Sequence, residues 1–335
     1  MKPSQRIATW RAVLLACAVG LASAAWAQEP AVGTLASRIE ARPFQTLSPT
    51  NQQFLTGDKS GPPVTIAGVL RLPQRAPGRS PAVIILHGSG GANAGNEVWA
   101  ELLNAMGIAT FVVDSWSGRG LTSTATDQAR IGLFVQTLDA FRAYDVLAAH
   151  PRIDPNRIAL MGSSRGARGV LWASMTRFQK LWAASGIKFA AFVSLYGPCD
   201  SPMVIGDTDV SASPMRLFHG TPDDYVPVAP CRAFVSRLQA AGRDIQLTEY
   251  ADSWHQFDNP LGNKVPAVAR ANQTLRNCRL TEEPMGRIIN ADSKQPFTYD
   301  DQCVELGPHL GYNEASTQAA HKAVAALFTS VFGAK

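Results

Sequence analysis

The sequence predicts an α/β fold with a mostly parallel central sheet and helices on both of its faces. Two observations carry this prediction. Short continuous apolar runs, such as "PAVIILHG" at residues 81–88, are typical of strands that are covered on both faces. These runs alternate along the chain with helical patterns, and that alternation favours β-α-β crossovers and therefore parallel strands.

The regular pattern begins at Val64. "VTIAGVLRLP" alternates like a half-buried strand and is expected to run antiparallel to the rest, whereas residues 28–60 before it read as irregular. Apolar runs predict further strands at 81–88, 108–116, 157–161, 189–198, 215–220 and 245–250. Helical patterns, several of them ended by Gly or Pro, predict helices at 96–107, 127–150, 166–175, 231–242 and 314–332.

Residues from about 259 to 311 interrupt this pattern. They are polar, contain many Gly and Pro residues and have weak periodicity. We call this segment the insertion, and a long irregular excursion from a compact domain is usually functional or tied down. We therefore expect residues 28–335 to form a single domain that carries the insertion.

The first 27 residues have the features of a secretory signal peptide. Three cations and no acid precede an alanine-rich apolar stretch, and Ala25-Trp26-Ala27 fits a cleavage motif, which leaves Gln28 as the first mature residue. The apolar stretch has about 16 residues and falls short of the roughly 20 that a membrane span needs. We expect an exported protein, periplasmic or secreted, without a stable membrane anchor; an uncleaved anchor and a lipoprotein modified at Cys17 are the alternatives.

Charge and cysteine content limit the partners. The formal net charge is +5, of which the leader supplies three, and the chain lacks the basic clusters that nucleic-acid binding requires. An exported chain with four mature cysteines suggests two disulfides, and we expect Cys199–Cys231 and Cys278–Cys303, although four cysteines allow three connectivities and free thiols are the alternative. No C-x-x-C or H-x-x-x-H spacing occurs, so no metal site is expected.

A G-x-S-x-G pattern lies between a predicted strand and a predicted helix. In "LMGSSRGARGV" the fitting frame runs from Gly162 to Gly166 and makes Ser164 the candidate nucleophile, with Ser163 as its neighbour. Glycine on both sides removes the Cβ atoms that would collide in so sharp a turn. The alternative interpretation is a glycine-rich turn without chemistry.

Reactive side chains also follow the other predicted strands. "HGTPDDYVP" supplies Asp223 and Asp224 after one strand, and "ADSWHQF" supplies His255 after the next. The order Ser, Asp, His, each at the carboxyl end of a strand, is that of an α/β-hydrolase triad. His255 would act as the base and Asp223 as the acid, with Asp224 as the second choice.

Backbone amides are expected to stabilise the oxyanion of the tetrahedral intermediate. The amide of Arg165 follows the nucleophile, and "HGSGG" after the strand at 81–88 offers the amide of Ser89. Gly88, Gly90 and Gly91 would let this loop approach the substrate closely.

The motifs around Ser89, Ser164, Asp223 and His255, together with "VVDSWSGRG", resemble those of the dienelactone hydrolase family. The resemblance covers about residues 64–258 and the last helix. The resemblance implies the α/β-hydrolase fold and hydrolysis of a small-molecule ester or lactone without a metal or organic cofactor. The founding members carry cysteine at the nucleophile position, where this chain has Ser164, and a general carboxylesterase is therefore expected rather than a dienelactone hydrolase. Export and the insertion are further departures.

Four side chains near the predicted strand ends are candidate substrate contacts. Arg119 and Arg165 could recognise a substrate carboxylate, and Trp116 and Trp254 could form an apolar wall. The structural alternative pairs Arg165 with an acid, leaves Arg119 in solvent and packs both tryptophans against the sheet. Two other functions compete with the serine esterase: a peptidase of the same fold, and a non-catalytic binding protein on a hydrolase scaffold.

Overall fold

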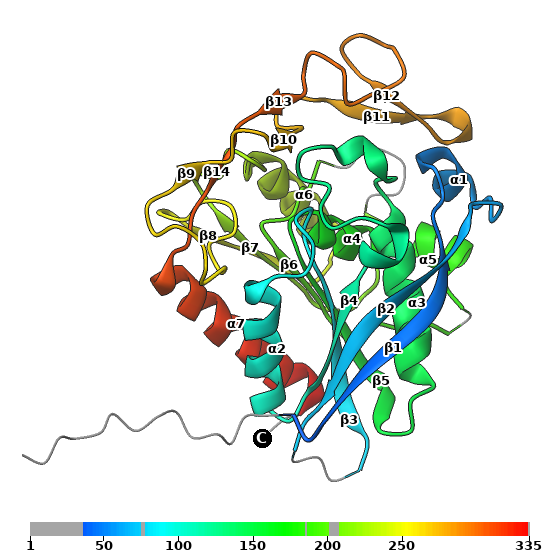
Figure 1. Cartoon of the computed structure of the whole chain (residues 1–335), viewed down its shortest axis with the longest axis vertical. Coiled ribbons are helices and arrows are strands. Elements are labelled where there is room, and N and C mark those ends of the chain that lie inside the picture. The colour runs from blue at the N-terminus through cyan, green and yellow to red at the C-terminus, as the bar shows by residue number, and fades with distance from the viewer. Residues whose placement is uncertain (1–35, 75–77, 185, 201–207, 334–335) are drawn as a thin grey trace, which may run out of the picture. The chain divides into compact units, whose positions relative to one another are not determined.

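The computed structural model describes residues 36–74, 78–184, 186–200 and 208–333 (Figure 1). All of them belong to one compact unit, Gly33–Lys335. The predicted leader at 1–27, with its cleavage motif, lies outside the described residues. Within the described part of the chain, no helix combines the length and the apolar character that crossing a membrane requires.

Eight strands form the central sheet in the order β1-β2-β4-β3-β5-β6-β7-β8. β2 pairs antiparallel with β1 and β4, and every pair from β4 through β8 is parallel. The predicted mostly parallel sheet is therefore confirmed. The bounds are β1 Arg38–Leu47, β2 Pro63–Leu72, β3 Ser80–Leu86, β4 Ala109–Asp114, β5 Ile153–Ser163, β6 Phe192–Leu195, β7 Met215–Gly220 and β8 Ile245–Tyr250.

Helices cover both faces of this sheet (Figure 1). α2 (Ala94–Ala105) and α7 (Glu314–Phe332) pack on one face. The other face carries α3 (Val135–Ala148), α4 (Arg165–Ala173) and α6 (Ala229–Ala240), and the short helices α1 (Asn51–Thr56) and α5 (Thr176–Trp182) belong to the same hydrophobic cluster. Three 3₁₀ turns complete the set: η1 Ser117–Arg119, η2 Gln128–Arg130 and η3 Pro284–Gly286.

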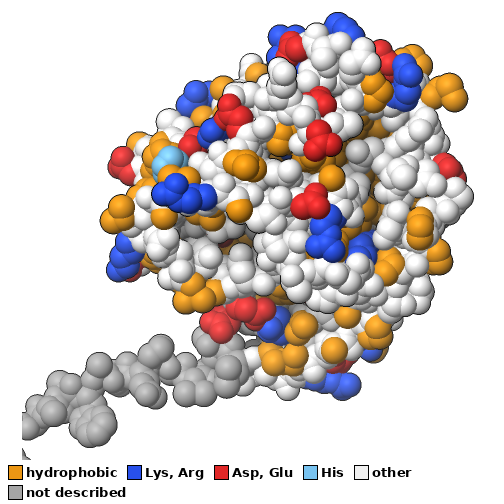
Figure 2. Space-filling model, turned by 45° about the horizontal axis from the view of Figure 1, so that its top comes forward, with side chains coloured by type: hydrophobic (Ala, Val, Ile, Leu, Met, Phe, Trp, Pro, Cys, Tyr) orange, Lys and Arg blue, Asp and Glu red, His pale blue; other side chains and the backbone are white. Residues whose placement is uncertain are grey.

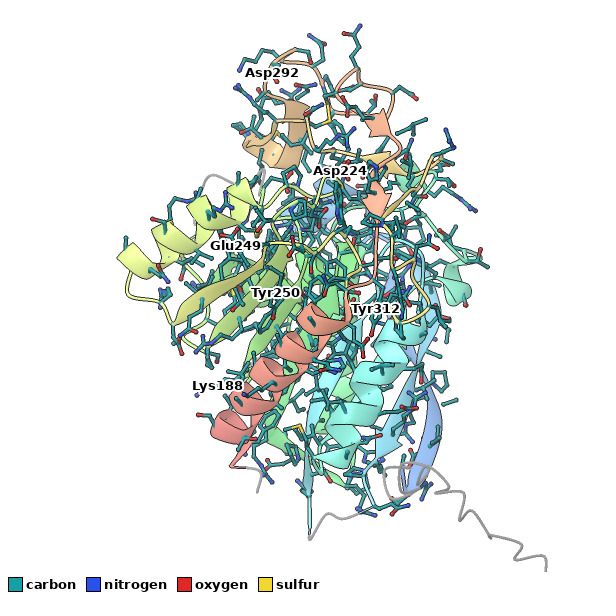
Figure 3. The ribbon with its side chains drawn as sticks, turned by 90° about the vertical axis from the view of Figure 1, so that its left-hand side faces the viewer. Lys188, Asp224, Glu249, Tyr250, Asp292 and Tyr312 are labelled. Carbon is teal, nitrogen blue, oxygen red and sulfur yellow. A yellow bond between two sulfur atoms is a disulfide. The ribbon has the colours of Figure 1, made fainter. Side chains whose placement is uncertain are left out.

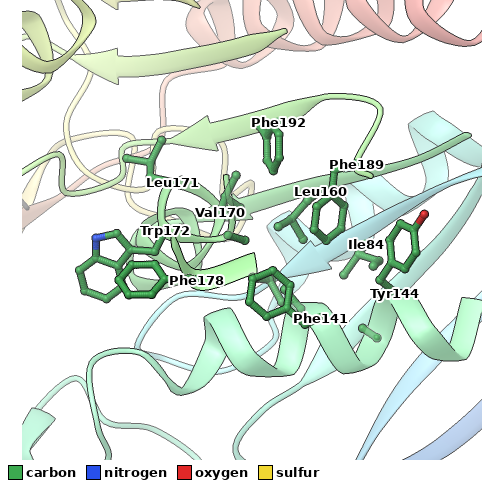
Figure 4. Close-up of a cluster of buried hydrophobic side chains, with 14 of the residues drawn as sticks. Ile84, Phe141, Tyr144, Leu160, Val170, Leu171, Trp172, Phe178, Phe189 and Phe192 are labelled. Carbon is green, nitrogen blue, oxygen red and sulfur yellow. The ribbon is translucent and has the colours of Figure 1, made fainter. Parts of the chain in front are cut away.

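The larger hydrophobic cluster lies between the sheet and α3, α4 and α5. Figure 4 shows Phe141 and Tyr144 from α3 facing Ile84 and Leu160 of the sheet, with Phe192 of β6 nearby. These side chains are almost fully removed from solvent. Their packing holds α3 against the sheet. α4 contributes to the same cluster and packs on β5, and the turn between β5 and α4 carries the G-x-S-x-G motif.

The prediction that residues 28–60 are irregular is wrong for their described part. β1 pairs with β2 from Arg38↔Leu72 to Leu47↔Pro63, and α1 follows it. β1 is the outermost strand, and only Phe44 and Thr46 along it are buried. Because so few of its positions face the core, its apolar pattern is too weak to be recognised in the sequence.

The helix predicted at 127–150 is shorter than expected and begins at Val135. An ideal Cβ at Gly132 would lie 2.7 Å from the carbonyl oxygen of Pro49, so the chain passes too close to its neighbour for a side chain there. The guanidinium of Arg165 donates hydrogen bonds to the carbonyl oxygens of Ile131 (2.9 Å) and Gly132 (3.0 Å). These carbonyls serve the tertiary structure, and the regular helix starts after them.

The insertion contains three two-stranded sheets rather than irregular chain alone. The pairs are β9 with β14, β10 with β13, and β11 with β12. In Figure 1 they lie above the edge of the main sheet at which its parallel strands end. The bounds are β9 Ala267–Val268, β10 Gln273–Thr274, β11 Leu280–Glu283, β12 Arg287–Asn290, β13 Glu305–Leu306 and β14 His309–Leu310.

Candidate active site

Ser164 occupies a sharp turn between β5 and α4. Its φ of 53° and ψ of −119° fall in a strained region for a residue with a side chain. An ideal Cβ at Gly162 would come within 2.7 Å of Gly166, and one at Gly166 within 2.5 Å of the carbonyl oxygens of Leu86 and His87. Glycine is therefore required at both motif positions, and the turn presents the serine at the carboxyl edge of the sheet.

The glycine-rich loop after β3 lies directly against this turn. An ideal Cβ at Gly88 would be 3.2 Å from the Cβ of Ser164. The carbonyl of Ser89 is held by the indole of Trp116 (3.1 Å) and by the amide of Thr124 (2.8 Å). Arg165 is the first residue of α4, and the amides of a first helical turn have no partner within the helix. Ser89, Ser164 and Arg165 all line the same cavity.

His255 connects the serine to an aspartate. Its Nε2 lies 2.8 Å from Oγ of Ser164, and its Nδ1 lies 2.8 Å from Oδ2 of Asp223. All three side chains are at least nine-tenths buried. The rings of Tyr196 and Tyr225 pack against the imidazole at 4.7 and 4.6 Å between centroids, which restricts its rotation.

The carboxylate of Asp223 is fully surrounded by donors. Its Oδ1 accepts from the amides of Tyr225 and Val226, both at 2.9 Å, and Nε2 of His219 lies 3.4 Å from Oδ2. Burial acts to raise the pKa of this carboxyl group, but the charge of His255 and hydrogen bonds from both histidines outweigh it and lower the pKa to about 2. Asp223 is therefore ionised at all ordinary pH values.

Asp224, the second choice for the acid, points away from His255. Its carboxylate accepts from Arg276 at 3.2 Å and from the backbone amide of His309 at 2.8 Å, and the ring Nδ1 of His309 lies 2.9 Å away. Figure 3 shows Asp224 at the base of the insertion and Asp292 at its far side. The two neighbouring aspartates thus serve different contacts, one with the imidazole and one with the insertion.

A cavity of about 510 Å³ opens at Ser164. The domain lines it with Ser89, Arg165, Arg168 and Tyr225, among others, and residues 275–280 of the insertion line it from the other side. This volume lies within the range of small-molecule sites, about 300 to 1,000 Å³.

Two arginines face this cavity from α4. Arg165 donates to Oε1 of Gln128 (3.2 Å) and to the two carbonyls near η2, so the expected pairing with a structural acid is replaced by neutral oxygens. Arg168 was missed in the sequence, although its position four residues after Ser164 places it on the same helix face. Among the residues that the structure describes, the nearest carboxylate oxygen belongs to Asp200 and is 4.0 Å away, and Nε of Arg168 has no hydrogen-bond partner.

Three expected substrate contacts lie elsewhere. Arg119 binds the buried Asp139 with both terminal nitrogens, at 2.8 and 2.9 Å, so it is neither in the cavity nor in solvent. Trp116 is 1% exposed and supports the Ser89 loop, and Trp254 packs on the ring of His309. None of the three is among the described residues that line the cavity at Ser164.

The cysteines lie in two pairs at bonding distance. Sγ of Cys199 is 1.99 Å from that of Cys231, and Sγ of Cys278 is 2.06 Å from that of Cys303. The first pair links the loop after β6 to α6, and the second lies within the insertion. Among the described residues, no group of three or more His, Cys, Asp or Glu side chains is arranged to hold a metal ion.

On the face that Figure 2 shows, the surface near the insertion carries both acidic and basic side chains. In Figure 2 the acidic and basic side chains are interspersed with apolar ones on the face that the insertion contributes to.

The chain was compared with known proteins by sequence and by structure. No curated protein shows significant sequence similarity to the chain. The solved structures that resemble it include the dienelactone hydrolase-like promiscuous phosphotriesterase P91 from metagenomic libraries, with 18% identity and a TM-score of 0.55, and m3DLH, with 18% identity and a TM-score of 0.58. Each alignment covers 88% of this chain and 98% of the other, and at this identity the likeness concerns the fold.

The family comparison is more specific. The profile of the dienelactone hydrolase family matches residues 66–282, which is more than half of the chain and includes Ser164, Asp223 and His255. The resemblance noted in the sequence is confirmed. The chain belongs to the dienelactone hydrolase family of the α/β-hydrolase superfamily and is a carboxylic ester hydrolase.

Proposed function

We propose that the protein is an exported serine hydrolase that cleaves carboxylic esters or lactones through an acyl-enzyme on Ser164. The observation that carries this proposal is the hydrogen-bonded chain from Ser164 through His255 to Asp223, with 2.8 Å at each step. A serine hydroxyl is a weak nucleophile near neutral pH and needs a base that takes its proton during attack.

In the acylation step, Oγ of Ser164 attacks the ester carbonyl carbon while Nε2 of His255 takes the hydroxyl proton. The carbonyl oxygen becomes an oxyanion, and the amides of Ser89 and Arg165 donate hydrogen bonds to it. The bond to the leaving oxygen then breaks, and the imidazolium returns its proton to the departing alcohol. Water repeats the sequence on the acyl-enzyme, which releases the acid and restores Ser164.

Asp223 holds the imidazole in the tautomer that this chemistry needs. The carboxylate accepts a hydrogen bond from the Nδ1–H group of His255, so Nε2 is left with a lone pair toward Ser164. Because the pKa of Asp223 is lowered to about 2, it stays ionised and stabilises the imidazolium that forms during attack.

We further propose that Arg165 favours esters that carry a free carboxylate. Its guanidinium is buried, lines the cavity and bonds neutral oxygens. A substrate carboxylate would supply the opposite charge that these neutral partners lack. Such esters should have a higher kcat/KM than neutral isosteres, and Arg165→Gln should remove the difference while sparing neutral esters; equal rates in the unaltered enzyme at low ionic strength would refute this.

Export is supported by the two cysteine pairs, because disulfides persist in oxidising compartments. The signal peptide proposed at 1–27 agrees with it. Secretion of the chain with its first residue at Gln28, found by N-terminal sequencing of the exported protein, is the expected result.

A panel of esters and lactones, measured beside Ser164→Ala and Ser163→Ala, tests the proposed reaction. The Ser164 variant should stay folded and lose at least about 10⁴-fold in kcat, because the hydroxyl carries the covalent step. Ser163→Ala is the matched control and should lose far less. An equal loss in both variants, or full activity without the Ser164 hydroxyl, would reject the nucleophile.

A further inference from the structure

A buried aspartate lies three positions after His255 and takes no part in the proposed reaction. Asp258 is 2% exposed, and its two carboxylate oxygens accept hydrogen bonds from different elements. The hydroxyl of Tyr196, which follows β6, donates to Oδ1 at 2.6 Å, and the indole of Trp99 in α2 donates to Oδ2 at 2.7 Å. Burial raises the pKa of this carboxyl group whereas the two hydrogen bonds lower it, so its ionised form depends on both donors.

Tyr196 connects this carboxylate to the imidazole of His255. The two rings meet edge to face, with 4.7 Å between their centroids and 64° between their planes. Burial and the charge of Asp258 raise the pKa of the Tyr196 hydroxyl well above its usual value, so the hydroxyl keeps its proton and donates it to the carboxylate in the hydrogen bond. One side chain therefore contacts the proposed base through its ring and the buried carboxylate through its hydroxyl.

The backbone of Tyr196 is strained. Its φ of 40° lies in the left-handed region, which residues with a side chain rarely adopt. Such a conformation persists only where the surrounding structure enforces it. The amide of Tyr196 donates to the carbonyl of Phe218 in β7 at 2.7 Å, and its hydroxyl is held by Asp258. The hydroxyl bond is thus one of the restraints that keep the strained residue, and with it the ring, against the imidazole.

We propose that Tyr196 and Asp258 are positioning residues for His255. The carboxylate holds the phenol ring in place, and the ring keeps the imidazole in contact with Ser164 and Asp223. The inference rests on the proposed function and deepens it. The imidazole must keep both 2.8 Å contacts, because a displacement of about 1 Å in a reacting group can cost about 100-fold in rate. Neither positioning residue is among the described residues that line the cavity, so their loss should act on the chemical step rather than on substrate binding.

The test measures kcat and KM for p-nitrophenyl acetate in Tyr196→Phe, in Asp258→Ala and in the variant that carries both changes. Tyr196→Phe removes a single oxygen atom, so it breaks the bond to Asp258 and retains the ring. The matched control is Tyr250→Phe. The ring of Tyr250 packs on Phe257 in the same loop at 5.2 Å, and its hydroxyl has no hydrogen-bond partner among the described residues. Circular dichroism of each variant establishes that it is folded.

Each single change should lower kcat by about tenfold and leave KM within about twofold, because the transition state depends on the placement of the base more than substrate binding does. The double variant should lose no more than the weaker single variant, since both residues act through the same hydrogen bond. Tyr250→Phe should keep its kcat. The proposal is overturned if Tyr196→Phe is folded and keeps its kcat, or if the two losses multiply in the double variant. Failure of the proposed function is seen separately, as absent acetate hydrolysis in the unaltered enzyme or as hydrolysis that persists in Ser164→Ala.

Discussion

Nε2 of His255 lies 2.8 Å from Oγ of Ser164, although 91 positions separate the two residues in the chain. The contact arises because β5 and β8 end at the same edge of the sheet, and the turn after each strand projects toward the other. The fold therefore pairs a serine hydroxyl with an imidazole at a point where a cavity opens.

The two neighbouring aspartates should respond differently to the same substitution. Asp223→Asn should lower kcat by about 10⁴-fold, because an amide in place of the carboxylate holds the imidazole in the wrong tautomer. Asp224→Asn is the matched control and should keep most of the activity on a small ester, since Asp224 contacts the insertion. Steady-state kinetics on p-nitrophenyl acetate measures both. A larger loss in the Asp224 variant would reverse the assignment.

Asp223 should also contribute to stability in acid. The pKa of the carboxyl group is about 2 in the folded protein and 3.8 as its ordinary value, so the unfolded chain takes up the proton first as the pH falls. This part of the stability is complete above about pH 4 and is lost as the pH approaches 2, and at pH 3 the loss is about 1 kcal/mol.

Urea unfolding at pH 6 and pH 3 measures this difference. The free energy of unfolding should fall by about 1 kcal/mol more in the unaltered protein than in Asp223→Asn. The comparison uses the change with pH within each protein, so a different baseline stability of the variant does not affect it. An identical pH dependence in both proteins would show that the carboxyl group is not stabilised in its ionised form.

Arg119 should stabilise the folded protein through its ion pair with the buried Asp139. Arg119→Ala should lower the free energy of unfolding by about 3 to 5 kcal/mol, because it leaves the carboxylate of Asp139 buried without its cation. Arg287→Ala is the control: Arg287 is paired with Glu283 on the surface and is mostly exposed, so its loss should cost at most about 1 kcal/mol. A mild effect of Arg119→Ala on unfolding, with a selective loss of activity, would restore the substrate-contact interpretation.

The cysteine pairs predict a specific peptide map. Digestion without reductant should yield the peptides of Cys199 and Cys231 joined, and those of Cys278 and Cys303 joined. Removing the second pair, which closes a loop of 25 residues, should lower the free energy of unfolding by roughly 3 kcal/mol. Four unmodified thiols in protein isolated from the exported fraction would contradict both pairings.

The sheet and the proposed catalytic residues could be predicted because they depend on local patterns. Most of the parallel strands are apolar runs, and Ser164, Asp223 and His255 each follow the end of a strand by at most five residues. β1 could not be predicted in the same way, because an edge strand with few buried positions has almost no apolar pattern. The insertion gave no signal for its short strands, since two-residue strands have no measurable periodicity.

The residues that line the cavity at Ser164 were harder to predict, because the lining depends on where long side chains point. Arg119 follows a strand end, as the triad residues do, yet its side chain turns back to Asp139, 20 positions further along the chain. Arg168 lies within a helix and gave no strand-end signal, although it lines the cavity. Leu275 lines the cavity because the insertion folds over the domain, and this folding requires contacts between residues far apart in the chain, such as Thr274 with Tyr225.

Labelling with a fluorophosphonate probe reports directly whether Ser164 is the activated nucleophile, because such probes react with a serine only when a neighbouring base activates it. We expect one adduct per chain, located on Ser164 by peptide mass spectrometry, with no adduct in Ser164→Ala and none in His255→Ala. A folded protein that hydrolyses esters and carries no adduct, or carries it on Ser163, would show that Ser164 is not the nucleophile.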